Sequence, residues 1–497
     1  MSGRPPVGHA PTVFTTILTT LALTASVLDP VGSPTAVDAA AVDSIVERYR
    51  EEVALPGAAV AVTRGDTVVH AAGYGRTPGG DAITERTTLA VASVSKSFTA
   101  LAVLQLAERG RIGLDDPVQA HLPEFTMADP RAGAITVRQL LDQTSGMSDT
   151  TSTPFSGPAV HTLREAVASM REAGLADAPG STWRYHNPNF QVAARLVEVV
   201  SGVPFAEYLR RNVFDPLGMT GSGTGDTERD LPPSARGHVR VLGVPLAVPE
   251  PPAFGNGSGG VLSTARDMAA WLIAQNNGGR GANGTSIATP DGIAATHTPS
   301  GAAKSYGLGW FVGTTASGAP LVHHSGDLFT STAYQALLPA SGHGVAVMAN
   351  TGLQHGDAQA IAERLIAAIE GREPPPAGDP WPAVVDAVLL GAAVVVGVAT
   401  WRGARRSRRW ATRRRSAPWA VVRLVPLALP LLLLVTVHRV VGFLYRGRDV
   451  SWRQVPYLYP TFVVLLAVAA VGCAAVLVAR AAAVVRAARR PVDGAAR

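Results

Sequence analysis

The chain has very little cysteine and lacks several motifs of metal and nucleotide enzymes. Cys473 is the single cysteine among 497 residues, which excludes an intrachain disulfide framework and paired-cysteine zinc or redox sites. No HExxH zinc motif and no glycine-rich loop ending in GK[ST] is present. No serine has glycine two positions before and two after it, so the nucleophile elbow of α/β-hydrolases is missing. We expect no metal and no organic cofactor.

Acidic residues are scarce in the C-terminal quarter. Residues 381–497 hold 18 Arg and three Asp, a net charge of +15, whereas residues 1–380 carry a net charge of −9. A nucleic-acid-binding protein would carry positive charge on its large folded part, so we expect no nucleic-acid partner. With 47% hydrophobic residues, intrinsic disorder is also disfavoured. The length exceeds the roughly 250–300 residues that one core supports, so at least two structural units are expected.

Three apolar runs occupy this C-terminal quarter, at about 381–401, 419–438 and 461–479. A helix of about 20 apolar residues crosses a membrane, although Pro426 and Pro430 weaken the middle run. Arg-rich segments follow the first and third runs, and such segments stay in the cytoplasm. We expect a multi-pass cell-membrane protein, held in lipid by about three helices within 381–486, with a basic tail at 487–497. A buried helical domain is the alternative, which the flanking basic segments disfavour.

The N-terminus fits a topology in which the central region is extracytoplasmic. Arg4 precedes an apolar stretch at 13–28, and small residues follow near Ala39. Residues 1–39 are expected to be a signal peptide or an N-terminal anchor, and both lead the central region outside the membrane. Residues 373–380 begin with Glu-Pro-Pro-Pro and are expected to form a stiff linker before the membrane region.

The central region, residues 42–372, mixes strands with helices. Its expected elements are a hairpin at 58–63 and 67–72, helices at 97–109 and 357–369, and a strand at 344–349. Strands at both ends with helices between them predict an α/β domain, in which a sheet carries an inserted, mostly helical lobe. A cleft between two such lobes is a common place for a small-molecule or peptide substrate.

Lysine is the second scarce residue type, with Lys96 and Lys304 against 41 Arg. Lysine can lose its proton where arginine cannot. Lys96 ends the run Ser93-Val94-Ser95-Lys96 at the start of the apolar helix, where residues three apart share a face. A lysine shielded from water can be neutral near pH 7 and serve as the base for Ser93. The alternative is a capping serine followed by a solvated lysine.

A second polar motif, Tyr185-His186-Asn187, precedes a helical stretch at 191–200. The Tyr185 phenol could pass a proton between Ser93 and a leaving group, and Asn187 could hydrogen-bond a substrate amide. A loop aromatic with a helix-capping asparagine is the alternative interpretation of this motif.

A third motif, His324-Ser325-Gly326, follows an expected edge strand at 321–323. Gly326 would let a substrate backbone approach closely, and the N–H of Asp327 could complete an oxyanion hole. His323 and His324 are adjacent strand residues that point to opposite faces, so at most one of them can enter a given site. An ordinary strand end is the alternative interpretation.

These motifs closely resemble those of the serine beta-lactamase and penicillin-binding protein superfamily, in the branch of class C beta-lactamases, DD-peptidases and esterases. The resemblance covers about residues 45–370, with S-x-x-K, Y-x-N and an H-S-G in place of K-T-G in that order and spacing. Four flanking segments match as well, at 110–125, 135–147, 257–271 and 306–310. The resemblance implies a beta-lactamase/transpeptidase-like antiparallel sheet flanked by helices, with the helical lobe inserted.

The resemblance also implies a role for each residue. Ser93 would be acylated, and Lys96 and Tyr185 would shuttle its proton and later activate the deacylating water. Asn187 would bind the acyl amide. The N–H groups of Ser93 and Asp327 would form the oxyanion hole, beside the substrate-binding residues His324, Ser325 and Gly326.

His324 departs from the beta-lactamase pattern, because class C enzymes resembling this chain carry lysine there and DD-peptidases and esterases often carry histidine. A neutral imidazole holds a carboxylate less well than an ammonium group. We therefore expect a membrane-anchored serine hydrolase acting outside the cytoplasmic membrane on peptide (D-amino-acid), amide or ester bonds. A true beta-lactamase is one alternative. A non-catalytic sensor is the other, which the intact Ser93, Lys96 and Tyr185 disfavour.

Overall fold

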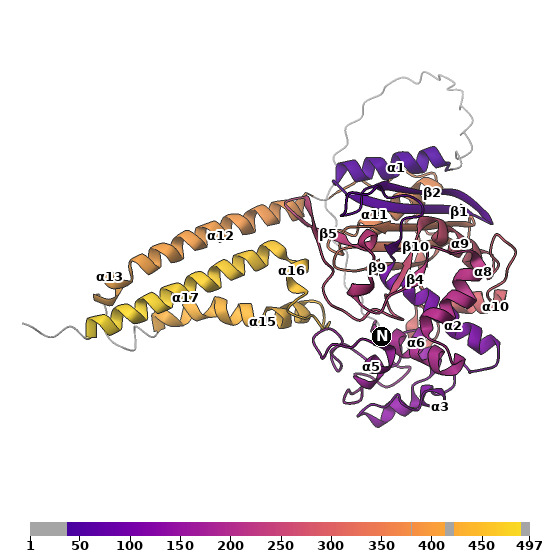
Figure 1. The fold of residues 1–497 in the computed structure, drawn as a ribbon, viewed down its shortest axis with the longest axis horizontal. Coiled ribbons are helices and arrows are strands. Elements are labelled where there is room, and N and C mark those ends of the chain that lie inside the picture. Colours follow the sequence, from indigo (N-terminus) through magenta and orange to yellow (C-terminus); the bar gives the residue numbers. More distant parts are fainter. Residues whose placement is uncertain (1–36, 379, 413–421, 489–497) are drawn as a thin grey trace, which may run out of the picture. The chain divides into compact units, whose positions relative to one another are not determined.

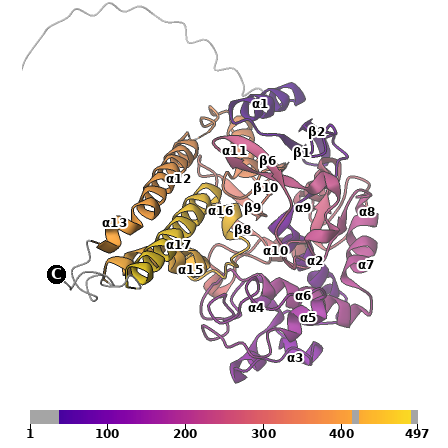
Figure 2. The ribbon, with the colours of Figure 1, turned by 60° about the vertical axis from the view of Figure 1, so that its left-hand side comes forward.

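A six-stranded antiparallel sheet organises the computed structural model, which describes residues 37–378, 380–412 and 422–488 (Figures 1 and 2). The strands lie in the order β2-β1-β11-β10-β9-β8. Their bounds are β1 (Gly57–Arg64), β2 (Thr67–Gly75), β8 (Phe311–Thr314), β9 (Pro320–Asp327), β10 (Thr332–Leu338) and β11 (His343–Ala349). Strands from both ends of the domain therefore share one sheet, which confirms the predicted fold class.

Alternate residues of the central strands face different helical layers, as the pleat of a strand requires. On β1, Val60 packs with α1 (Ala39–Glu52) and α11 (Asp357–Ile369), whereas Ala59 packs in the cluster that includes α9 (Ala265–Asn276). Because both faces of the sheet are covered, β1 is apolar along most of its length instead of alternating with polar residues.

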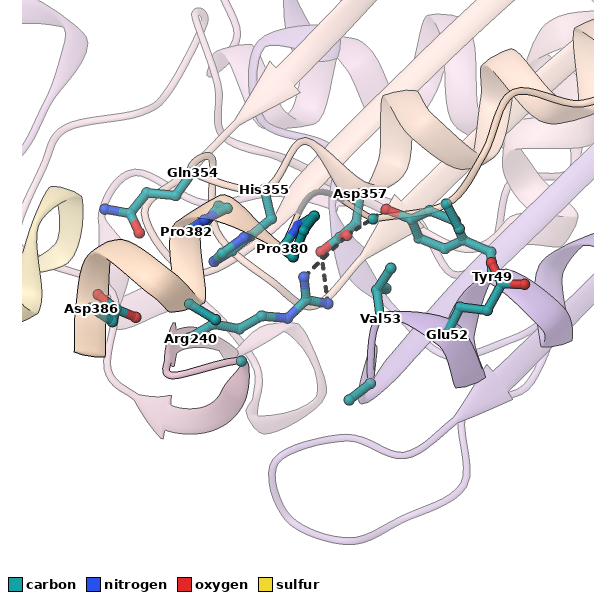
Figure 3. A pocket seen from close by; sticks show the side chains of 15 residues that line it. Tyr49, Glu52, Val53, Arg240, Gln354, His355, Asp357, Pro380, Pro382 and Asp386 are labelled. Carbon is teal, nitrogen blue, oxygen red and sulfur yellow. Dashed lines mark hydrogen bonds and ion pairs between the residues drawn. The ribbon is translucent and has the colours of Figure 1, made fainter. Parts of the chain in front are cut away.

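A buried ion pair joins the α1–α11 layer to the small β5–β6 hairpin, β5 (Gly237–Val241) and β6 (Val244–Val248). Asp357 lies between the Tyr49 hydroxyl, 2.6 Å away, and the Arg240 guanidinium, 3.1 Å away (Figure 3). A cavity of about 540 Å³ lies beside these three side chains. All three are buried, so the pair ties α1, the hairpin and α11 into one layer.

The inserted lobe lies between β2 and β8 and is mostly helical, as predicted. Its helices are α2 (Ser95–Glu108), α3 (Val118–His121), α4 (Val137–Leu141), α5 (Leu163–Ala168), α6 (Pro188–Ser201), α7 (Phe205–Leu209), α8 (Asp215–Leu217), α9 and α10 (Pro290–Thr296). A second small sheet, in the order β3-β7-β4, contains β3 (Leu89–Ala90), β7 (Val261–Ser263) and β4 (Gly223–Thr224).

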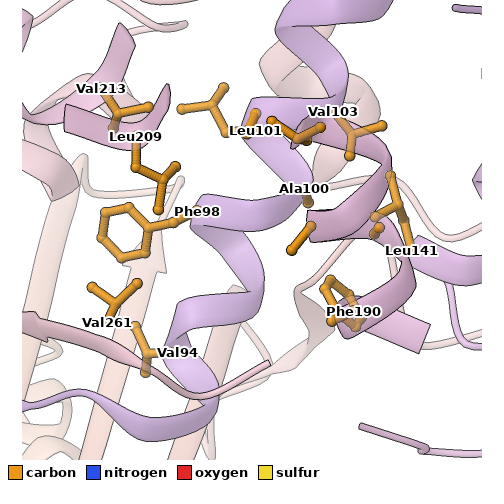
Figure 4. Packing of buried hydrophobic residues seen from close by; sticks show 14 of the residues in the cluster. Val94, Phe98, Ala100, Leu101, Val103, Leu141, Phe190, Leu209, Val213 and Val261 are labelled. Carbon is orange, nitrogen blue, oxygen red and sulfur yellow. The ribbon is translucent and has the colours of Figure 1, made fainter. Parts of the chain in front are cut away.

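Helix α2 runs through the core of this lobe and is buried from Ser95 to Leu106. Figure 4 shows Phe98 of α2 directed toward Leu209 and Val261, with Phe190 of α6 on the other side of the helix. Phe98 also stacks on Trp271 of α9, with ring centroids 3.9 Å apart. A helix buried on every side gives its first turn a fixed position, and this turn carries Lys96.

Three C-terminal helices are long and apolar enough to cross a membrane, at Trp381–Arg405, Val422–Leu444 and Pro460–Arg486. They correspond to α12 (Trp381–Arg405), the stretch that ends with α15 (Leu429–Leu444), and α17 (Pro460–Ala488). Helices α12 and α17 lie side by side in both views (Figures 1 and 2). The middle helix continues to Leu444, past the predicted end at 438. The predicted start of that run, at 419–421, lies outside the described residues.

The predicted N-terminal segment lies outside the described residues up to 36, and so do residues 489–497 of the predicted basic tail. Helix α1 begins at Ala39, and the Asp38 side chain caps it by accepting from the Ala41 N–H at 2.8 Å. From Val37 onward the chain forms one compact unit by its internal contacts.

Candidate active site

Ser93 lies in a tight turn between β3 and α2. Ala92 adopts a left-handed backbone conformation with φ of 47°, and a 3₁₀ turn over Ala92–Val94 leads into the helix. A non-glycine residue in this region costs about 1–3 kcal/mol, which the surrounding packing has to offset. Ser93 is half-buried whereas Ala92 and Val94 are buried. Ser93 is therefore the accessible residue of the turn.

Lys96 is fully buried one turn further along. Its Nζ lies 2.9 Å from Ser93 Oγ, 2.9 Å from Asn187 Oδ1 and 2.7 Å from the Ser258 carbonyl oxygen. Burial lowers the pKa of Lys96 well below its usual range, and the charge of Arg448 lowers it further. A neutral amine has two N–H donors and one lone pair. Asn187 Oδ1 and the Ser258 carbonyl can only accept, so the lone pair of the neutral amine faces the Ser93 hydroxyl.

Tyr185 lies in the loop before α6, with its ring centroid 4.8 Å from Lys96 Nζ. Burial raises the pKa of the Tyr185 phenol, and a hydrogen bond with Ser93 and the charge of Arg448 oppose this rise. A phenol whose pKa is raised stays protonated near pH 7. It can pass a proton along a hydrogen-bonded chain, but it is a poor candidate for the resting base, which leaves that role to Lys96.

Asn187 lies directly before α6, where Pro188 occupies the first helical position. Its side chain makes no helix-capping hydrogen bond and instead accepts from Lys96, so the capping alternative is wrong. The amide nitrogen is then free to donate to a ligand carbonyl. His186, in the middle of this turn, is fully buried. Its Nδ1 lies 2.6 Å from Asp149 Oδ1, and this contact fixes the turn.

The H-S-G motif lies inside β9. Residues 321–323 lie in a strand as predicted, but their predicted position at the edge of the sheet is wrong. The short strand β8 pairs with β9 from Pro320 to His323 and is itself the edge of the sheet. Beyond His323 this pairing stops, so residues 324–327 have no strand partner on that side among the described residues. An extended peptide could hydrogen-bond to this free part of the strand.

Gly326 lies against the turn that carries Ser93. A Cβ atom added there would lie 2.2 Å from the Val91 carbonyl oxygen, 3.1 Å from Ala92 Cβ and 3.2 Å from the Ser93 nitrogen. The close backbone approach that the glycine permits is therefore between β9 and the Ser93 turn. Asp327 follows at the exposed end of β9, and Ser325 is half-buried before it.

His324 is a neutral, fully engaged imidazole. It is 1% exposed, Nδ1 donates to the Ser325 carbonyl at 2.6 Å, and Nε2 accepts from the Tyr306 hydroxyl at 3.0 Å. Burial lowers the pKa of His324 to about 3. Both ring nitrogens thus have protein partners, and His324 offers no positive charge to a substrate near pH 7.

Two residues of the site were missed by the sequence reasoning. Ser258 accepts from Lys96 through its main chain, and its one signal was the flanking segment 257–271 that carries the resemblance. Arg448 comes from the segment between α15 and α17, and nothing in its sequence surroundings pointed to the site. Among the described residues, no group of three or more His, Cys, Asp or Glu side chains could hold a metal ion.

Comparison with known proteins gives a consistent result. A family model described as Beta-lactamase matches residues 42–369. Protein flp of Staphylococcus aureus (strain COL) is 27% identical over 314 residues, which is 62% of this chain and 62% of flp, so the chain spans less than two thirds of that relative. The octameric penicillin-binding protein homologue from Pyrococcus abyssi is 26% identical with a TM-score of 0.58, over 67% of this chain and 77% of the other. The penicillin binding protein from Bacillus halodurans is 25% identical with a TM-score of 0.55, over 64% of this chain and 98% of the other.

Proposed function

The chain belongs to the beta-lactamase family, and on that basis we propose that it hydrolyses peptide (D-amino-acid), amide or ester bonds through an acyl-enzyme on Ser93. The observation that carries this proposal is the set of three short contacts at the buried Lys96 amine, one of them to the Ser93 hydroxyl. Serine is a weak nucleophile without an adjacent base, and this arrangement supplies one.

In the proposed acylation step, Ser93 Oγ attacks the substrate carbonyl carbon and its proton passes to the neutral Lys96 amine. Tyr185 relays a proton to the leaving group, and Asn187 donates its amide N–H to the acyl amide. The N–H groups of Ser93 and Asp327 receive the developing oxyanion. One such donor contributes about 3–4 kcal/mol to stabilising the transition state. In deacylation, Lys96 and Tyr185 activate a water molecule by the reverse proton path.

The proposed location is the outer side of the cytoplasmic membrane. Three helices are long and apolar enough to anchor the chain, and the Arg-rich segments after the first and third favour a cytoplasmic position for both segments. Three crossings then leave residues 42–372 outside, together with the segment between α15 and α17. Residues 1–39 would serve as a signal peptide or anchor, and 373–380 as the linker.

The function is tested on the full-length protein in detergent with a fluorophosphonate probe that labels activated serines. We expect the wild type to be labelled, Ser93→Ala to lose labelling completely, and Ser341→Ala, at an exposed serine in the β10–β11 turn, to label like the wild type. Labelling of Ser93→Ala would assign the nucleophile elsewhere, and an unlabelled wild type would favour a non-catalytic binding domain.

The substrate class is tested by hydrolysis of p-nitrophenyl acetate, a D-Ala-D-Ala peptide and nitrocefin by the same protein. We expect weak or no turnover of nitrocefin, because the neutral His324 stands where class C beta-lactamases that resemble this chain carry lysine. High turnover of nitrocefin would favour the beta-lactamase alternative over a peptidase or esterase.

A further inference from the structure

We propose that the segment between the second and third membrane helices, residues 445–459, forms a wall of the active site, and that its Arg448 binds an anionic group of the substrate. The inference rests on the proposed function, because it assigns a charge to the substrate of the same site. Residues 445–459 are called the membrane loop below.

The membrane loop is docked on the catalytic domain at two separate points. The Asp449 carboxylate accepts hydrogen bonds from the Phe155 N–H at 2.6 Å, from the Ser156 N–H at 2.8 Å and from the Ser156 hydroxyl at 2.6 Å. At the other end of the loop, the Tyr457 hydroxyl donates to the Pro249 carbonyl at 2.8 Å. The Tyr457 ring also meets the Phe329 ring, with centroids 5.9 Å apart. Contacts at both ends hold the loop against the domain.

Arg448 directly precedes Asp449 and reaches the turn that carries Tyr185. Its Nε is 3.1 Å from Asp149 Oδ2, and its Nη1 donates to the Tyr185 carbonyl at 3.1 Å. Its guanidinium carbon is 5.5 Å from the Tyr185 ring centroid. Asp149 also receives the Asp449 N–H at 3.2 Å and pairs with His186 through its other oxygen. The loop is thus attached to the Tyr185–Asn187 turn, directly through Arg448 and through the shared Asp149 carboxylate.

The site needs a cation if its substrate is anionic, and the two basic groups deepest in the site do not supply one. His324 is neutral with both nitrogens engaged, and burial favours the neutral form of Lys96. Arginine side chains are permanent cations in proteins, and 36% of the Arg448 side chain is exposed. Arg448 donates one hydrogen bond through Nη1 and pairs with Asp149 at Nε, and its Nη2 group has no hydrogen-bond partner among the described residues, so it can donate to a ligand.

The neighbouring carboxylates indicate where the anion would bind. Asp149 is buried and already shared between His186 and the membrane loop. Asp327, at the exposed end of β9, would repel an anion. The anionic group is therefore expected on the Tyr185 side of the site, where a planar guanidinium can hold a carboxylate through two parallel hydrogen bonds. A peptide with a free C-terminal carboxylate has the matching chemistry.

The test compares two substrates that differ only in this charge: an N-acyl D-Ala-D-Ala peptide with a free carboxylate and its C-terminal amide. Full-length Arg448→Ala and Arg448→Lys proteins are assayed in detergent against the wild type, with Arg453→Ala, an exposed arginine of the same loop, as the matched control. We expect Arg448→Ala to lower kcat/KM at least tenfold for the carboxylate peptide and less than threefold for the amide. Arg448→Lys should retain part of the difference, and Arg453→Ala should behave like the wild type.

The fluorophosphonate labelling rate of each variant reports separately whether the catalytic site is intact. If Arg448→Ala lowers kcat/KM equally for both peptides, or for neither, the proposed role of Arg448 is wrong. The proposed function still stands in that case, provided that the wild type is labelled. Unlabelled wild type would overturn the proposed function and the inference with it. A loss confined to the carboxylate peptide, with labelling unchanged, would establish Arg448 as the anion-binding residue.

Discussion

The protonation state of the Lys96 amine determines whether it can accept the proton of the Ser93 hydroxyl. Two of its three hydrogen-bond partners are oxygens that can only accept, so the protonated amine would donate to Ser93 as well, whereas the neutral amine accepts the Ser93 proton. The nucleophile is therefore activated only in the neutral state. Burial among Tyr185, Phe190 and the α2 core favours that state.

Replacement of Lys96 should abolish most of the acylation. We expect Lys96→Ala to lower the rate of fluorophosphonate labelling by about 10³-fold or more, because nucleophile and base act as one unit. Lys96→Arg should not restore the rate, since a guanidinium does not give up its proton. Lys304→Ala, at the exposed second lysine, is the matched control and should label normally. A loss below tenfold in Lys96→Ala would contradict the assignment of the base.

The lowered pKa of Lys96 also fixes the sign of the pH dependence. Below that pKa the amine gains a proton and acylation slows about tenfold per pH unit, whereas above it the rate is level. The labelling rate, followed from acidic to alkaline pH, should reach its plateau well below the usual lysine pKa of 10.5. Removing the charge in Arg448→Ala should shift the acidic limb to higher pH. A wild-type rate that keeps rising up to the usual lysine pKa would show that the amine is not desolvated.

The contact between β9 and the Ser93 turn joins two elements that are far apart in the sequence. Gly326→Ala would push a methyl group into the Val91 carbonyl and the Ser93 turn. We expect the variant to lose about 1–3 kcal/mol of stability from overpacking and about 10²-fold in labelling rate from displacement of the nucleophile.

Gly313→Ala on the neighbouring strand β8 is the matched control, because a Cβ atom there meets nothing within 4 Å. Thermal unfolding and labelling should both remain close to the wild type in this variant. If Gly326→Ala were as stable and as active as Gly313→Ala, the approach of β9 to the nucleophile would not matter for catalysis.

The elements that were predicted correctly have patterns of apolar residues that lie within one short segment of the sequence. The hairpin of β1 and β2 and the closing helix α11 have clear apolar patterns, and α11 begins and ends where predicted. The edge-strand error arose because β8 is only four residues long, two half-buried and two exposed, which gives no readable pattern. Ser93, Lys96, Tyr185 and His324 were singled out because each lies in a short motif with fixed spacing, and their role as site residues stays a prediction.

What could not be predicted depends on contacts over long sequence distances. Ser258 contributes a main-chain carbonyl, and the identity of a side chain says nothing about where its carbonyl points. Arg448 reaches Asp149 across almost 300 residues, and only the folded chain brings the two together. His324 was identified as the informative residue, but its bond to Tyr306 became visible only in the structure.

At the scale of the whole molecule, the predicted topology has the membrane loop and the catalytic domain on the same side of the membrane. This can be tested in intact cells with a membrane-impermeant maleimide on single-cysteine variants in a Cys473→Ser background. We expect Arg453→Cys, in the membrane loop, to be labelled from outside, and Arg409→Cys, in the Arg-rich segment after α12, to be labelled only after lysis. The reverse pattern would invert the topology, and labelling of both in intact cells would mean that α15 does not cross.

The docking of residues 445–459 on the Tyr185 turn also affects how the chain can be studied. A soluble version cut before Trp381 would keep Ser93, Lys96 and His324, yet Asp149 would lose its guanidinium partner and the Phe155 and Ser156 amides would lose their acceptor. In such a fragment, the region around Asp149 and Phe155 would be more negatively charged and would have fewer contacts to order it than in the intact chain. Substrate preferences measured on it would describe the fragment and not the full-length protein.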